Sequence, residues 1–315
     1  MKTITNAGPA KLTKGQRLGR DIWRSRELYM FLIPGLILTF IFSYIPMYGI
    51  QIAWKQLRLG EPMTGGRWVG WKNFERFFSS SRFLEIMWNT ISLNLCLLFI
   101  NTPFAIGMAL LMHNSSSKRL KSWTQTTTYL PNMVSMVIVV QLIELFTNPS
   151  SGLINILIKR GGGQAINFGY EPWFIPMYLI SAIWQSAGYS SILYLSALSA
   201  IDQSIEEAAR IDGASKLQRM WHIDLKLIIP TIATMMILNF GKILTAASME
   251  KVLLMQTPVN IGASEILSTY TYQIGVISSQ YGFGAATGLF NSVVNIAMLL
   301  VANFVSKKVA KTSLF

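Results

Sequence analysis

Long runs of apolar residues, separated by shorter polar connections, dominate the pattern of this sequence. A helix needs about 20 mostly apolar residues to cross the hydrocarbon core of a membrane. Six segments meet this requirement, and we expect each of them to form one transmembrane helix. They lie at residues 28–54, 88–112, 126–146, 173–198, 227–248 and 284–306.

Polar residues interrupt several of these apolar runs. Asparagine, glutamine, serine and proline occur within 88–112, 126–146 and 173–198. Neighbouring helices can satisfy such groups inside a membrane, whereas lipid cannot. The pattern therefore predicts an all-α, polytopic membrane protein whose helices surround a polar interior.

The composition supports a membrane protein. Of the 315 residues, 51% are hydrophobic and 13% are charged, whereas soluble domains carry about 25% charged residues. The single cysteine, Cys96, lies in an apolar run and can form no internal disulfide, and the two histidines, His113 and His222, are far apart. We therefore expect no metal centre.

The net charge of +13 could indicate nucleic acid as a partner, but the basic residues form no single patch. They cluster at the ends of apolar runs, where lysine and arginine set the orientation of a membrane protein. Seventeen of the 27 fall in 1–27, 113–125, 199–226 and 307–315, and nine fall in the alternate connections. We expect a six-helix domain at 28–306 with cytoplasmic tails at 1–27 and 307–315, although six basic residues in 55–87 oppose this orientation.

Two segments outside the spans also carry a prediction. The stretch 71–87 (WKNFERFFSSSRFLEIM) is rich in aromatic residues and predicts a helix lying at the outer membrane interface. The connection 199–226 predicts two short helices joined at Gly213, a residue that adopts positive φ without steric penalty. Small and apolar residues on these helices would suit either close contact with a partner or a loop resting on the membrane surface.

Motifs for enzymatic chemistry are absent from the sequence. It contains no G-x-x-x-x-G-K-[ST], no G-x-S-x-G, no H-E-x-x-H and no C-x-x-C, so it lacks the usual phosphate-binding, nucleophile and zinc signatures. The chain is predicted to be a transporter and not an enzyme. Lys242 is the one basic residue within an expected span, and intramembrane charge indicates a functional site by default.

The 199–226 connection resembles the EAA motif of ABC importer permeases, whose pattern is E-A-A-x-x-D-G-A followed by a hydrophobic residue, I, L-P and a final P. Met220 stands where phenylalanine is usual, and Lys226 replaces the proline after Leu225. The positions that match are Glu207, Ala208, Ala209, Asp212, Gly213, Ala214, Ile223, Leu225 and Pro230.

Other stretches resemble maltose-type sugar permeases. Residues 68–74 (WVGWKNF) are similar to the V-G-x-x-N-[FY] stretch before the second span, and 89–90 (NT) and 129–131 (YLP) are similar to the openings of the second and third spans. The arginine-rich tail and residues 45–48 (IPMY) look most like permeases for complex oligosaccharides or polysaccharide fragments.

This resemblance implies a type I ABC importer permease fold in a bacterial inner membrane. It also implies several partners: a second homologous permease, a dimer of ABC ATPase subunits, an extracytoplasmic solute-binding protein, membrane lipid and an oligosaccharide. ATP and magnesium would bind to the ATPase, and this chain would bind no cofactor directly. The residues implied to couple the chain to the ATPase are Glu206, Glu207, Ala208, Ala209, Asp212, Gly213, Ala214, Met220, Trp221 and Ile223.

A sugar pathway needs aromatic faces and a few polar groups. The same amides could instead join helices through hydrogen bonds, each contributing about 0.6–2 kcal/mol, and Lys242 could bind an acidic sugar or extend toward Glu250. Alternative functions are a permease for a non-sugar solute and a secondary transporter, although inverted repeats are not evident. The candidate pathway residues are Trp184, Gln185, Tyr189, Asn239, Lys242, Asn291 and Asn295.

Overall fold

The computed structural model describes residues 23 and 25–309, and the chain divides into two units, residues 1–52 and 53–315. Each unit is described by itself. Most of the two expected tails, 1–27 and 307–315, lies outside the described residues.

The described part of the first unit is helical. It contains α2 (Arg26–Thr39), a π-helical turn (Phe40–Tyr44) and the beginning of a 3₁₀ helix (Ile45–Trp54). None of the residues of α2 is buried, and the helix is apolar on all sides. An all-apolar helix is typical of a membrane span, in agreement with the expected span at 28–54.

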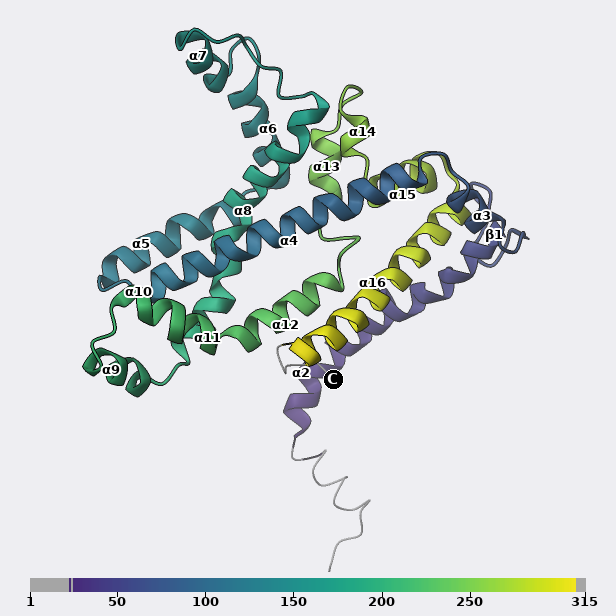
Figure 1. Cartoon of the computed structure of the whole chain (residues 1–315). Coiled ribbons are helices and arrows are strands. Elements are labelled where there is room, and N and C mark those ends of the chain that lie inside the picture. The colour runs from purple at the N-terminus through teal and green to yellow at the C-terminus, as the bar shows by residue number, and fades with distance from the viewer. Residues whose placement is uncertain (1–22, 24, 310–315) are drawn as a thin grey trace, which may run out of the picture. The chain divides into compact units, whose positions relative to one another are not determined.

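The second unit consists of helices and one short antiparallel pair of strands (Figure 1). The strands are β1 (Lys55–Gln56) and β2 (Arg67–Trp68), with Lys55 opposite Trp68. The α-helices are α3 (Lys72–Phe78), α4 (Phe83–His113), α5 (Lys118–Tyr129), α6 (Met136–Thr147), α7 (Leu153–Arg160), α8 (Glu171–Ser199), α9 (Gln203–Ile211), α10 (Lys216–Arg219), α11 (Leu225–Leu227), α12 (Ile229–Phe240), α13 (Met249–Met255), α14 (Ile261–Ser264), α15 (Leu267–Tyr272) and α16 (Tyr281–Val309). Short 3₁₀ or π-helical turns occupy Leu130–Met133, Met220–Asp224 and Gln273–Ile277.

Helices α4 and α8 form the centre of this unit, and α5 packs along α8 (Figure 1). Small residues allow the close approach. A Cβ atom at Gly188 of α8 would overlap the carbonyl oxygen of Thr128 in α5, so glycine is required for this spacing. Ala105, Ala109 and Leu198 are fully or almost fully buried in the core beside it.

The single helix expected at 71–87 is wrong in its extent, and its place at the outer membrane interface stays a prediction. The structure ends α3 at Phe78 and begins α4 at Phe83. Phe77 is buried, and its ring lies 6.1 Å from that of Phe283 and 5.3 Å from that of Phe290, both on α16. The sequence predicted that Phe77 lies at the membrane interface, whereas its ring belongs to a core that attaches α3 and α4 to α16.

Three helices in the described part of the chain are long and apolar enough to cross a membrane, and up to five candidates result if each bent pair counts as one span. The first pair, Lys118–Met133 and Met136–Thr147, bends by 99°, so the span expected at 126–146 is not one straight helix. The second pair, Lys216–Leu227 and Ile229–Phe240, bends by 56°. Helix α8 is 29 residues long but is not among these candidates. The count of six spans stays a prediction.

The span expected at 227–248 also differs from the structure, because α12 ends at Phe240 and residues 241–248 are not helical. Side chains of neighbouring helices bind the freed backbone groups. Leu244 N–H donates to Asn295 Oδ1 (3.1 Å), Ala247 N–H to Asn94 Oδ1, and Ser248 N–H to the Tyr178 hydroxyl (2.9 Å). Irregular backbone inside a membrane bundle needs such partners, so these polar side chains make the break tolerable.

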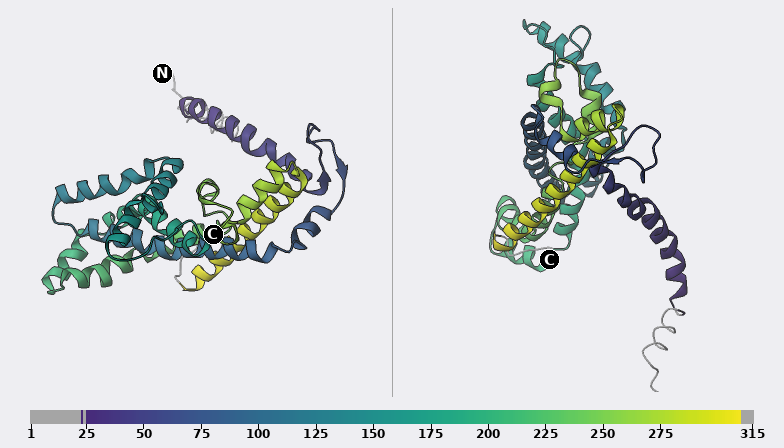
Figure 2. Two further views of the ribbon diagram at one scale, coloured as in Figure 1. Left: turned by 90° about the horizontal axis from the view of Figure 1, so that it is seen from above. Right: turned by 90° about the vertical axis from the view of Figure 1, so that its right-hand side faces the viewer.

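The second unit has two distinct ends. In Figure 1, and in the right-hand view of Figure 2, α9 and α10 lie at the opposite end of this unit from α7. The break at 241–248 lies between them, where α12 leads toward α13. The two regions with predicted functions, the EAA-like segment and the interior, are therefore separate parts of this unit.

Candidate functional site: a two-sided segment and a polar cavity

The turn between α9 and α10 has a defined hydrogen-bond pattern. Asp202 caps the start of helix α9, and its carboxylate accepts from Ser204 N–H (2.9 Å). At its end Gly213 has φ +78°, and the N–H of Ala214 reaches the carbonyl of Ala209 (2.9 Å). This is the pattern of a glycine-terminated helix, so the sharp stop predicted at Gly213 is confirmed.

One side of α9 faces the rest of the unit. The carboxylate of Glu206 lies 2.9 Å from Nε2 of His113, the last residue of α4, and Ala209 is buried. Met220 packs against the core formed by α4 and α8. These residues therefore attach the segment to the helix bundle and are not on its free face.

The other side is exposed. Glu207 and Ala208 are exposed, and Ile211, Leu217 and Trp221 are 86%, 66% and 59% exposed. Exposed apolar side chains outside the expected spans suit contact with a partner or with the membrane surface. Met220 and Trp221 both lie in the π-helical turn Met220–Asp224, where Met220 is half-buried and Trp221 is exposed. The remaining predicted positions of this segment are exposed or half-buried: Asp212, Gly213, Ala214 and Ile223.

A polar cluster lies where the segment meets α4. Ligand atoms of His113, Glu206 and Asp224 all lie within 4.8 Å of one another, a set that could hold a metal ion. His113 contacts Glu206, however, and Asn114 Nδ2 donates to Asp224 Oδ2 (2.7 Å). Asp224 is 1% exposed. Through these contacts the cluster links the end of α4 to both ends of the 199–226 connection.

A cavity of about 270 Å³ lies between α4, α8 and the break after α12. Amide and hydroxyl groups line it together with apolar side chains, as in sites for small polar ligands. Lys251, on α13, is the one charged residue among the described residues that line it. The polar lining residues are Asn94, Asn101, Thr102, Tyr178, Gln185, Ser186, Asn239, Ser248 and Lys251.

Two of the seven predicted pathway residues, Gln185 and Asn239, line this cavity. Trp184 lines a separate apolar hollow beside α6, and Tyr189 and Lys242 are exposed and line neither. Asn291 and Asn295 lie on α16 and are joined by a hydrogen bond of 3.2 Å.

Sequence reasoning missed seven of the nine polar residues that line the cavity, among them Asn94, Asn101 and Lys251. Asn94 and Asn101 lie in the second expected span. The sequence analysis noted asparagine there, but it did not recognise that a spacing of seven residues places both side chains on the same face of a helix. Lys251 was placed in an outer connection, because the break at 241–248 that returns α13 to the interior has no clear sequence signal. It is 1% exposed.

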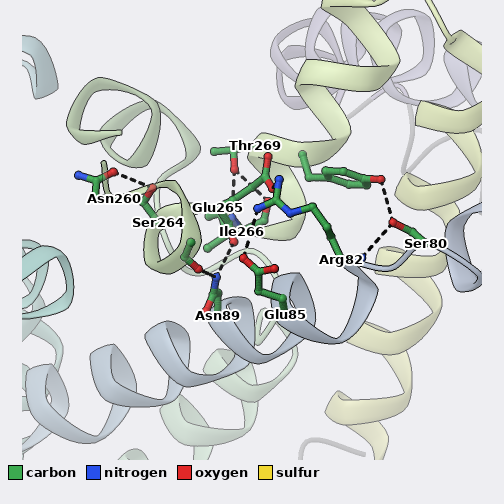
Figure 3. Close-up of polar contacts among 11 residues, drawn as sticks. Ser80, Arg82, Glu85, Asn89, Asn260, Ser264, Glu265, Ile266 and Thr269 are labelled. Atoms are coloured by element: carbon green, nitrogen blue, oxygen red, sulfur yellow. Dashed lines mark hydrogen bonds and ion pairs between the residues drawn. The ribbon is translucent and has the colours of Figure 1, made fainter. Parts of the chain in front are cut away.

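The segment that carries Lys251 is fastened beyond the cavity, at the start of α4 (Figure 3). The guanidinium of Arg82 lies 2.6 Å from the Glu265 carboxylate, and Asn89 Nδ2 donates to the carbonyls of Gly262 (2.6 Å) and Glu265 (3.2 Å). Leu267 N–H donates to Thr90 Oγ1 (2.8 Å). Asn89 and Thr90 thus bind the backbone of residues 262–267 to α4.

The 68–74 stretch also makes hydrogen bonds to a neighbouring backbone segment. Gly70 has φ +60°, and Asn73 Nδ2 donates to the carbonyls of Ala53 (2.9 Å) and Lys55 (3.0 Å). Val69 N–H donates to the Trp54 carbonyl (2.9 Å). The motifs at 68–74 and 89–90 therefore hold backbone segments in place and do not line the cavity.

Comparison with known proteins agrees with this architecture. The chain is 36% identical over 325 residues to the polygalacturonan/rhamnogalacturonan transport system permease protein YteP of Bacillus subtilis (strain 168), with 100% of each chain covered. It is 38% identical to protein LplB of the same strain, covering 95% of this chain and 92% of LplB.

Two solved structures are also similar, each with a TM-score of 0.84 and 35% identity. One is a bacterial ABC transporter involved in the import of the acidic polysaccharide alginate, covering 93% of this chain and 99% of that chain. The other is a bacterial alginate ABC transporter in complex with an alginate pentasaccharide-bound periplasmic protein, covering 95% and 100%. The fold is therefore that of a type I importer permease.

A family model for the inner membrane component of binding-protein-dependent transport systems matches residues 101–311. This range contains the EAA-like segment, α8 and the break after α12. Together with relatives above 30% identity along the whole chain, the match shows that this chain belongs to the family of inner membrane components of binding-protein-dependent transport systems.

Proposed function

We propose that this chain is one of two permease subunits that form the pathway of an oligosaccharide importer. The observation that carries the proposal is the amide-lined cavity between α4, α8 and α12, in a chain that matches the alginate importer permease over nearly its full length. Neutral hydrogen-bonding groups suit sugar hydroxyls, and Gln185 and Asn239 are the pathway residues with the best support.

The proposed partners follow from the family. A second permease would complete the pathway, and an extracytoplasmic binding protein would deliver the oligosaccharide. ATP and magnesium would bind to a separate pair of ATPase subunits. The exposed side of the α9–α10 segment, with Glu207, Ala208, Leu217 and Trp221, would contact one ATPase, which requires that α9 and both chain ends face the cytoplasm.

This arrangement explains why the segment has two sides. ATP binding would move the ATPase subunits, and the exposed side would follow them. The buried side, through Glu206 and Met220, would pass the movement to α4 and the core. The cavity, which lies between α4 and α8, would then open alternately toward the two sides of the membrane.

Reconstitution of the complete complex in proteoliposomes tests the proposal. The four kinds of subunit are co-purified, and uptake and ATP hydrolysis are measured with oligosaccharides, amino acids and phosphate. We expect ATP-dependent uptake of an oligosaccharide that requires the binding protein. Uptake of a non-sugar solute alone, or uptake driven by an ion gradient without ATP, would contradict the proposal.

A further inference from the structure

Lys251 is a buried lysine without an acidic partner. It lies on α13, is 1% exposed and lines the cavity. No ion pair between Lys251 and a carboxylate occurs within the described residues. Lysine is almost never fully buried unless it is paired, so this side chain lacks the group that normally accompanies it.

The contacts that Lys251 does make leave most of its binding capacity free. Its ammonium nitrogen donates to the Tyr178 carbonyl over a long distance of 3.4 Å and lies 4.7 Å from the centre of the Tyr178 ring. An ammonium has three donors, so two remain for a ligand. Burial lowers the pKa of Lys251 to about 8, so the charged form still predominates at neutral pH.

Position as well as charge is fixed. The N–H of Lys251 donates to Ser248 Oγ (3.3 Å), and Ser248 N–H donates to the Tyr178 hydroxyl (2.9 Å). Asn94, whose amide binds the backbone of Ala247, stands on the facing helix α4. The cation is therefore held on a supported turn at the wall of the cavity, as a specificity determinant must be.

The rest of the lining suits a hydroxylated ligand. Asn101, Gln185, Ser186 and Asn239 supply neutral donors and acceptors, and no carboxylate is among the described residues that line the cavity. A negative ligand thus meets one cation and no repulsion. A cavity of about 270 Å³ lies near the lower end of ligand pockets, at about 300 Å³, so it holds a short part of an oligosaccharide at a time.

We infer that Lys251 binds the carboxylate of a sugar-acid unit in the cavity and thereby makes the pathway selective for acidic over neutral oligosaccharides. The inference rests on the proposed function and adds the substrate class. An ammonium–carboxylate contact replaces the missing ion pair when substrate is present. A neutral oligosaccharide offers this ammonium no counter-charge and so gains no such contact.

The test uses the purified permease–ATPase complex and two probes of equal length. One is the trisaccharide of galacturonic acid, and the other is its carboxyl-reduced counterpart, which is neutral. Equilibrium binding of both is measured by titration calorimetry with wild-type complex, Lys251→Met and Lys251→Arg. Lys242→Met is the matched control, because Lys242 is exposed and does not line the cavity.

We expect wild type to prefer the acidic trisaccharide. Lys251→Met should weaken its binding roughly ten- to hundredfold, the factor for loss of one charge-assisted hydrogen bond, and leave the neutral probe unchanged. Lys251→Arg and Lys242→Met should keep the preference. A wild-type complex without preference, or a Lys251→Met complex that retains it, would overturn the inference.

Failure of the inference differs from failure of the proposed function. If reconstituted wild type takes up neutral and acidic oligosaccharides equally well, the inference is overturned and the proposed function stands. If it takes up no oligosaccharide, both are overturned. A purely structural role of Lys251 would lower the thermal stability of Lys251→Met and weaken both probes alike, which also overturns the inference.

Discussion

Glu206 Oε1 lies 2.9 Å from His113 Nε2, although 93 residues separate them along the chain. His113 is the last residue of the 31-residue helix α4, and Glu206 lies in the first turn of α9. The contact joins the exposed segment directly to the helix that lines the cavity at Asn94 and Asn101. In the proposed coupling, a displacement of α9 would reach the wall of the cavity through this contact.

The first prediction concerns this contact. Glu206→Gln removes the charged partner of His113, and we expect a loss of about 1 kcal/mol in the stability of the complex, the value for one partly exposed hydrogen bond. ATP hydrolysis should continue while uptake falls. Thermal unfolding in detergent and uptake in proteoliposomes measure the two effects.

The neighbouring residue gives the control for stability. Among the described residues, the carboxylate of Glu207 accepts only from Gln203, within α9. Glu207→Gln should therefore leave the unfolding temperature unchanged. Equal stability losses in both variants would show that the His113 contact does not anchor α9.

The second prediction concerns Gly213. A valine at φ +78° is strained by about 1–3 kcal/mol, and no atom lies within 4 Å of the Cβ it would add, so the effect is confined to the backbone turn. We expect Gly213→Val to insert and assemble but to lose stimulation of ATP hydrolysis by the loaded binding protein.

Gly60 offers a matched control. It has φ +87° and an equally open surrounding, but it lies outside the α9–α10 segment. Gly60→Val should retain stimulated hydrolysis. If Gly213→Val also retains it, the proposed role of this turn in coupling to the ATPase is wrong.

Sequence patterns predicted those features that depend on local geometry. The apolar runs located α4 and α16, and the Asp-Gly pair located the turn, because span length and positive φ are properties of short stretches. Long-range packing was less predictable. Phe77 was assigned to the membrane interface, since its sequence neighbours do not reveal that Phe283 and Phe290 surround it.

The cavity shows the same limit. Asn291 and Asn295 were expected on the sugar pathway, whereas Asn295 accepts the N–H of Leu244. The sequence does not reveal that the backbone after α12 leaves the helix. It therefore does not reveal that the N–H of Leu244 needs Asn295 as its acceptor. Lys251 enters the cavity through the same break, whereas the sequence left Lys242 open between binding an acidic sugar and extending toward Glu250.

The third prediction separates these two kinds of asparagine. Asn295→Ala leaves the N–H of buried Leu244 unpaired and should destabilise the protein by about 1–3 kcal/mol. Asn239 lines the cavity, and Asn239→Ala should lower uptake of oligosaccharide with little change in unfolding temperature. The reverse pattern, with Asn239 the more destabilising, would contradict the assignment.

The fourth prediction concerns the contact of α5 with α8. A methyl group at Gly188 would overlap the Thr128 carbonyl, so Gly188→Ala should destabilise by about 1–3 kcal/mol through overpacking. Gly107, on α4, has no atom within 4 Å of an added Cβ. Gly107→Ala should therefore be neutral or slightly stabilising. Thermal unfolding of both variants decides, and equal losses would contradict the close approach at Gly188.

The last prediction concerns the fastening at the start of α4. The Glu265 side chain is 7% exposed and lies 2.6 Å from the Arg82 guanidinium. Burial raises the pKa of Glu265, and Arg82 opposes this rise. Arg82→Met removes the cation from a buried carboxylate, and we expect a loss of about 1–3 kcal/mol, reduced from a fully buried pair because Arg82 is 37% exposed.

The sign of the pH dependence follows from the pKa. Without Arg82 the pKa of Glu265 rises further, so the folded variant binds a proton that the unfolded chain binds only at lower pH. Its stability then falls as the pH rises through the raised pKa. The difference in unfolding temperature between wild type and Arg82→Met should thus be larger at about pH 8 than at about pH 5.

Glu85→Gln is the control, because Glu85 is 44% exposed and should change stability by less than about 0.5 kcal/mol. A difference that is the same at both pH values would show that Arg82 does not hold Glu265 in its charged form.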